Sequence, residues 1–199
     1  MITCQTGEMI DFAAMPSPVV HSVTLMRHPE SRSGAVRNVG ALVSREPRGA
    51  LAITYSIEGD CARLRVPPPR PPRIAHGLWQ HTCCECFIAL KGQPGYHEFN
   101  FAPSGEWEAY AFAKYREGGP IADEELNPRI AVRSRAERLE LDASIPLDRL
   151  SAMHPHASLA LALSAVVEDE HGVLSWWALK HPPGKPDFHH PDAFVLELP

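Results

Sequence analysis

Residues 79–90 (WQHTCCECFIAL) and 96–110 (YHEFNFAPSGEWEAY) are the stretches whose alternation decides the fold. In the first stretch, Cys84 and Cys86 fall on one side of a strand, and Glu85 and Phe87 fall on the other. The pattern therefore predicts a strand with an apolar side and a reverse side that sets a carboxylate beside an aromatic ring.

The second stretch repeats this arrangement after a short turn. Phe99 and Phe101 share one side of the predicted strand, and Glu98 and Asn100 point to the opposite side. Two neighbouring strands of this kind can build a polar surface with stacking rings over a rigid core. We therefore expect a binding surface on their reverse side.

Alternating or apolar segments of strand length recur along the chain. We expect further strands at residues 19–26, 51–58, 61–66, 107–113, 129–134, 138–145, 158–167, 173–179 and 193–198. Roughly ten strands at this spacing are typical of an all-β sandwich or barrel. Residues 158–167 are apolar almost throughout, which fits a central strand covered on both faces or, by length, a helix; we take the strand.

Other segments have simpler patterns. Pro146 can begin one short helical turn over residues 146–150. The proline-rich residues 67–73 are predicted to be extended and exposed, because proline cannot donate a ladder hydrogen bond. Residues 1–18 carry little pattern, and residues 19–199 are expected to form a single domain.

Composition limits the partners of the chain. With 199 residues, 44% of them hydrophobic, it can bury a substantial core as one domain. Its formal net charge of −5 argues against nucleic acid, since binding phosphates requires excess positive charge. No apolar run approaches the roughly 20 residues that cross a bilayer, and the first residues lack the pattern of a signal peptide. We therefore expect a cytoplasmic protein without a membrane span.

The strand over residues 107–113 carries two large aromatic residues on opposite sides. Trp107 shares a side with Ala109, and Tyr110 shares the other with Phe112. Both rings cannot face one pocket, and we favour Tyr110 and Phe112 as the packing residues.

Cysteine and histidine invite a metal hypothesis. Cys84 and Cys86 share a face, but no second pair at zinc-site spacing accompanies them, and five cysteines do not suggest a disulfide framework. His181, Asp187 and His189 gather in a rigid proline-rich segment and could hold zinc or iron, with calcium a further candidate. A metal there could activate water for hydrolysis, so a metal-dependent hydrolase is the alternative to a binding protein.

The chain also resembles a known family. The matching residues are 78–83, Glu85, 98–107, Tyr110, 115–116, 177–182 and 186–189. Within roughly residues 20–199 this pattern resembles bacterial DOMON-like proteins, which are similar in turn to the family-9 carbohydrate-binding modules. The resemblance implies a β-sandwich of two antiparallel sheets that binds a small ligand, most simply a sugar, without transforming it.

The resemblance also implies site residues. In family-9 modules a tryptophan followed six residues later by a glutamate helps to form the sugar site, and Trp79 and Glu85 keep that spacing. A second stacking ring is expected from Trp176 or Trp177, and we favour Trp177. The full expected set of ligand-binding residues is Trp79, His81, Glu85, Asn100, Trp177, His181 and Lys185. This set suits a pyranose, which presents an apolar C–H face and a rim of hydroxyls.

The wider DOMON group adds haem as an alternative cofactor, because some members hold iron with an axial methionine and histidine. The candidate pairs here are Met153 with His154, and Met26 with His28. On this resemblance, a redox protein that binds haem is the second alternative to a sugar binder. The sequence pattern does not place a second ligand opposite either pair.

Overall fold

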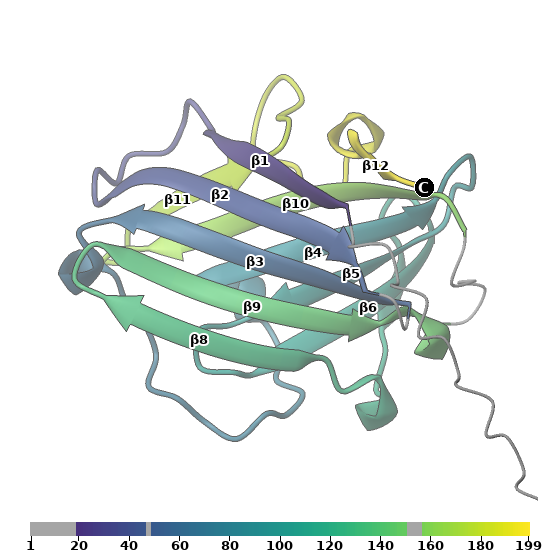
Figure 1. The fold of residues 1–199 in the computed structure, drawn as a ribbon. Coiled ribbons are helices and arrows are strands. Elements are labelled where there is room, and N and C mark those ends of the chain that lie inside the picture. The colour runs from purple at the N-terminus through teal and green to yellow at the C-terminus, as the bar shows by residue number, and fades with distance from the viewer. Residues whose placement is uncertain (1–18, 47–48, 151–156) are drawn as a thin grey trace, which may run out of the picture.

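The computed structural model describes residues 19–46, 49–150 and 157–199. Strands in these residues form two antiparallel layers packed face to face (Figure 1). The front sheet has the order β1 (Val20–Arg27), β2 (Val36–Arg45), β3 (Ala50–Gly59), β9 (Arg138–Pro146) and β8 (Arg129–Arg135). The expected two-sheet antiparallel β-sandwich is therefore confirmed.

The back sheet carries the remaining strands. Its order is β11 (Leu174–Ala178), β10 (Leu159–Glu168), β4 (Cys83–Leu90), β5 (Tyr96–Phe101), β6 (Trp107–Lys114) and β7 (Glu117–Pro120), and β12 (Leu196–Leu198) also pairs with β10. Strand β1 joins the two sheets, because Met26 and Arg27 at its end pair with Ala178 and Trp177 of β11. The sandwich is thus closed along one edge and open along the other.

The core lies between the sheets and follows the period-two pattern. From the back sheet, Cys84, Cys86 and Phe99 are at most 1% exposed and point inward. From the front sheet, Ile53 and Tyr55 meet them and are equally buried. Burying apolar side chains from both layers is the main stabilising contribution in such a sandwich.

A second apolar cluster lies on the outer face of the back sheet. It contains Phe87, Ala89, Tyr96, Ala162 and Ala193, and partly buried rings pack against it. Because this cluster covers the outer side of β10 while the core covers its inner side, β10 is buried on both faces. This explains the continuous apolar run of residues 158–167, which is a strand as expected.

Two strands were not expected from the sequence. In β2 the register shifts between Val36 and Asn38, and this irregularity breaks the alternation. Strand β7 has only four residues, Glu117–Pro120, with two glycines and a proline among them. The described part of the chain therefore has twelve strands instead of roughly ten.

The strand expected at residues 61–66 is wrong. This segment crosses from the front sheet to the back sheet, and among the described residues its only strand-like pairing is an isolated bridge between Leu64 and Asp169. Its ends are held separately: the backbone N–H of Cys61 donates to Ala136, and that of Arg65 donates to Glu168. Its first residues form the short 3-10 turn η1 (Cys61–Arg63).

The helices of the described residues are all 3-10 turns. Besides η1 they are η2 (Leu78–Gln80), η3 (Glu124–Leu126), η4 (Leu147–Arg149) and η5 (Pro191–Ala193). The turn expected at residues 146–150 is η4. Within the parts of the chain that the structure describes, no helix has the length and apolar character to cross a bilayer.

Candidate functional site

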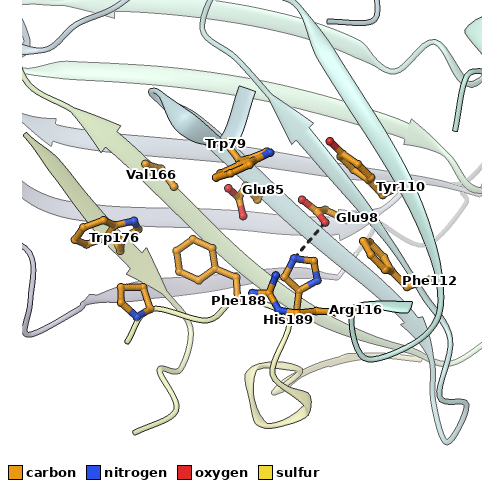
Figure 2. A pocket seen from close by; sticks show the side chains of 11 residues that line it. Trp79, Glu85, Glu98, Tyr110, Phe112, Arg116, Val166, Trp176, Phe188 and His189 are labelled. Atoms are coloured by element: carbon orange, nitrogen blue, oxygen red, sulfur yellow. Dashed lines mark ion pairs between the residues drawn. The ribbon is translucent and has the colours of Figure 1, made fainter. Parts of the chain in front are cut away.

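A cavity of about 500 Å³ opens on the outer face of the back sheet (Figure 2). Its floor is formed by Glu85 of β4, Glu98 of β5 and Val166 of β10. Its walls come from η2, β6, the turn between β6 and β7, β11 and the segment before η5. They consist of Trp79, Tyr110, Phe112, Arg116, Trp176, Pro186, Phe188 and His189. A polar floor thus lies within largely aromatic walls.

The floor is polar because of strand parity. Glu85 alternates with core residues of β4, so its side chain points away from the core. In the register of the sheet it lies opposite Asn100 of β5 and Ser164 of β10. Glu98 lies opposite Phe87 and is therefore the diagonal neighbour of Glu85 on the same face.

Each floor carboxylate is oriented by one neighbouring side chain. Ser164 Oγ donates to Glu85 Oε2 at 3.1 Å, and Asn100 Nδ2 donates to Glu98 Oε1 at 2.7 Å. The second oxygen of Glu98 lies 3.6 Å from His189 Nε2. Among the described residues, the second oxygen of Glu85 accepts no hydrogen bond, and Figure 2 shows both carboxylates directed into the cavity.

Burial raises the pKa of both floor carboxyls. The pKa of Glu85 lies well above its ordinary value, because burial and the nearby Glu98 disfavour its charged form. Burial, with Glu108 nearby, raises the pKa of Glu98 to about 7. Two acids this close resist double ionisation, so the pair retains a proton near neutral pH.

Trp79 lies close to Glu85 (Figure 2), and residues 76–81, which carry it, are bonded to the back sheet at both ends. Before it, Glu108 of β6 accepts from the Gly77 backbone N–H at 3.0 Å and lies 2.7 Å from His76 Nδ1. After it, His81 Nδ1 lies 2.7 Å from Glu168 Oε2 of β10. Trp79 itself remains 50% exposed, so its ring is fixed in place yet accessible.

The opposite wall is built from the segment before η5. Asp187 accepts hydrogen bonds from the Tyr115 hydroxyl at 2.7 Å and from Arg116 at 2.8 Å. His189 packs edge-on against Phe87 and lies 2.9 Å from the Tyr96 hydroxyl. Burial, together with the charge of Arg116, lowers the pKa of His189 to about 4, so this ring is neutral near pH 7.

Of the residues expected at the site, the structure brings Trp79 and Glu85 together in the cavity. Asn100 lies beside Glu85 on the outer face but is 0% exposed and does not line the cavity; its amide donates to Glu98. Trp177 does not face the cavity: it is 4% exposed in the core, and its neighbour Trp176 lines the wall. The parity of β11 explains the correction, since adjacent residues of a strand point to opposite faces.

The other expected residues also lie away from the cavity. The His81 ring contacts the carboxylate of Glu168 and does not line the cavity. His181 Nε2 lies 2.8 Å from the Met26 carbonyl oxygen, and its ring packs edge-on against His28. Lys185 is exposed and does not line the cavity, although the following Pro186 does.

The alternative metal triad is not assembled. His181, Asp187 and His189 have the separate protein partners given above, and no group of three or more His, Cys, Asp or Glu within the described ranges is arranged to hold a metal ion. Cys84 and Cys86 are free thiols in the core, where burial raises their pKa.

The described residues do not bring together the methionine–histidine pairs considered for haem. Met153 and His154 lie outside the described residues. Met26 is 51% exposed, whereas His28 is buried and its Nε2 lies 3.1 Å from the Gly184 carbonyl oxygen.

Three features of the cavity were not foreseen. Trp107, not Tyr110, is the large core residue of β6, at 2% exposure, and Tyr110 and Phe112 line the cavity, although Phe112 also packs against the outer apolar cluster as expected. The role of Glu98 could have been foreseen from parity, which sets it on the face of Glu85. Nothing periodic in the C-terminal segment points to Phe188.

The sequence matches no protein-family model and no curated protein. The fold, however, is similar to solved structures. A protein from Bacteroides uniformis ATCC 8492 that is provisionally described as carbohydrate-binding superposes with a TM-score of 0.61 at 14% identity, over 88% of this chain and 84% of that chain. A family-9 carbohydrate-binding module from Caldicellulosiruptor kristjanssonii in complex with cellotriose gives 0.50 at 10% identity, over 83% and 75%.

At these identities the likeness concerns the fold. It supports the expected relation to family-9 carbohydrate-binding modules at the level of architecture. The DOMON-like part of the resemblance stays a prediction.

Proposed function

We propose that the protein binds a carbohydrate in the cavity on the outer face of the back sheet, without transforming it. The observation that carries the proposal is the combination of the accessible indole of Trp79 with the inward carboxylate of Glu85 in one cavity. An aromatic plane accepts the C–H face of a pyranose, and a carboxylate accepts hydrogen bonds from its hydroxyls.

The rest of the cavity suits the same ligand. Trp176 and Phe188 offer further apolar surface on the wall opposite Tyr110, and a volume of about 500 Å³ accommodates one or two sugar rings. The solved structures of similar fold include a sugar complex, which supports a carbohydrate as the ligand class.

The segment that carries Trp79 supports binding by a preformed site. His76 and His81 flank the ring, and each contacts a buried carboxylate of the back sheet. A ring that is already oriented loses little conformational entropy on binding, which increases affinity.

Isothermal titration calorimetry with a panel of mono- and disaccharides tests the proposal. We expect saturable binding of at least one sugar, and a loss of about tenfold in affinity for Trp79→Ala, because a stacking ring is removed. Leu42→Ala is the matched control, since Leu42 is a 47% exposed apolar residue on the front sheet. Absence of binding by every sugar, or equal affinities of Trp79→Ala and the wild type, would contradict the proposal.

A further inference from the structure

The two floor carboxylates differ from the buried acids Glu106 and Glu168 in their partners. Glu106 lies within ion-pair distance of two arginines, and Glu168 pairs with Arg65 at 2.6 Å. Among the residues that the structure describes, no lysine or arginine lies within ion-pair distance of Glu85 or Glu98. Two acids therefore lie buried beside each other without a permanent cation to balance them.

Side chains around the cavity do not form an ion pair with either acid through a lysine or arginine in the described residues. The charge of Arg116 on the wall lowers the pKa of Glu98, but burial outweighs it, and the guanidinium itself is bound to Asp187 at 2.8 Å and stacks over Tyr115. His189, which faces Glu98 from the C-terminal segment, is neutral near pH 7 because its pKa is lowered to about 4. From β6, Glu108 and Tyr110 add an acid and a phenol to the surroundings of Glu98.

A ligand could balance this pair. Each carboxylate has one oxygen held by the sheet, through Ser164 or Asn100, and a second oxygen directed into the cavity. A protonated amine carries a positive charge and three N–H donors, and can therefore satisfy two such oxygens at once. The hydroxyls of a neutral sugar can donate to the same oxygens but leave the charge of the pair uncompensated.

The walls favour a cation as well. The faces of tryptophan and tyrosine rings attract ammonium groups, in addition to the C–H faces of sugars. Trp79, Tyr110 and Trp176 all line the cavity around the two acids. One ligand that combines a sugar ring with an ammonium group would use both the rings and the carboxylates.

We propose that the ligand is an amino sugar, whose protonated amine binds between the carboxylates of Glu85 and Glu98 while its ring lies against the aromatic walls. This inference rests on the proposed carbohydrate-binding function and narrows it to one chemical class. Because the acid pair retains a proton near neutral pH, binding of the ammonium group should release that proton to the solvent.

Calorimetry near pH 7 tests the inference with matched sugars. Glucosamine, galactosamine and mannosamine are each compared with the neutral parent sugar and with the N-acetyl form, which has no charge. We expect at least one free amino sugar to bind about tenfold more tightly than both of its neutral counterparts, as charged hydrogen bonds are stronger than neutral ones. Repeating the titration in two buffers of different ionisation enthalpy, neither an amine, should reveal proton release for the amino sugar alone.

Variants assign the preference to the acid pair. Glu85→Gln and Glu98→Gln should each reduce the preference for the amino sugar to within about threefold, while Glu137→Gln, an 81% exposed glutamate of the front-sheet side, should leave it unchanged. Thermal unfolding checks that each variant is folded. In the wild type the preference should also shrink from about pH 7 to about pH 5, as the pair becomes fully protonated.

The possible failures are distinguishable. Equal binding of amino and neutral sugars, or a preference that both Gln variants retain, would overturn the amino-sugar inference and leave carbohydrate binding intact. Failure of every sugar to bind would overturn the proposed function and this inference with it.

Discussion

The hydroxyl of Tyr55 in the front sheet donates a 2.6 Å hydrogen bond to the backbone carbonyl of Glu85 in the back sheet. Tyr55 is 0% exposed, so this bond crosses the core and holds β4, the strand that carries Glu85, on its inner side. This buried hydrogen bond therefore connects the front sheet to the strand that carries the candidate site.

Tyr55→Phe should lower the free energy of unfolding by about 1 kcal/mol, because the carbonyl loses a buried donor while the ring remains. Urea denaturation measures the change. Tyr115→Phe is the matched control: Tyr115 is 48% exposed and its hydroxyl bonds to Asp187 near the surface, so we expect a smaller effect. Equal losses in the two variants would argue against a special contribution from the buried bond.

Trp176 and Trp177 should have opposite consequences when truncated. Trp177→Ala should cost about 3–5 kcal/mol of stability, because it leaves a cavity in the core. Trp176→Ala should cost less stability and should weaken sugar binding, because Trp176 lines the cavity. Thermal or urea unfolding and calorimetry on both variants test this pair; a larger loss of stability in Trp176→Ala would reverse the assignment.

Alternation along the strands allowed the sandwich to be predicted, whereas the pairing of Trp79 with Glu85 was predicted from the resemblance to family-9 modules. Alternation along β4 and β5 fixes which side chains leave the core. The six-residue spacing brings an indole from the preceding turn close to a carboxylate of the strand. The same alternation sets Glu98 on the outer face, although its role at the floor needed the register between strands.

Which of the remaining side chains face the cavity is decided by long-range packing, and local sequence patterns do not indicate it. His81 follows Trp79 closely and looks like a ligand residue, yet its partner Glu168 is 87 positions away in sequence. Parity separates Trp176 from Trp177 but does not say which of them faces the core. Phe188 and His189 belong to a proline-rich segment without periodicity, and only its docking on the outer face of the back sheet brings them to the cavity.

His81→Ala should loosen the segment that holds Trp79. The contact between His81 and Glu168 fixes one end of this segment, so its loss should lower ligand affinity severalfold while stability falls by about 1 kcal/mol. Hydrogen exchange should become faster for backbone amides of residues 77–82. His171→Ala is a control, because His171 is a 72% exposed histidine whose only ion-pair contact in the described residues is with Glu170. Unchanged exchange and affinity in His81→Ala would exclude a positioning role.

Glu98→Gln should change how stability depends on pH. A carboxyl whose pKa is raised in the folded state is protonated in both states below about pH 4.5, and contributes no pH dependence there. As the pH rises toward 7, the unfolded chain ionises while the folded protein keeps its proton, so stability falls, by at most about 1.4 kcal/mol per pH unit for one group. Gln cannot ionise, and the variant should lose this fall.

Urea denaturation of the wild type and Glu98→Gln between about pH 4.5 and about pH 7.5 measures the difference. We expect the two curves to lie close together at the acidic end and to separate with increasing pH, with the variant becoming relatively more stable. Glu85 should contribute in the same direction, because burial also raises its pKa, and removal of the neighbouring charge should lower that pKa in the variant. Glu137→Gln should run parallel to the wild type, and a parallel curve for Glu98→Gln would mean that Glu98 is ionised at neutral pH and that its charge is already balanced in the folded protein.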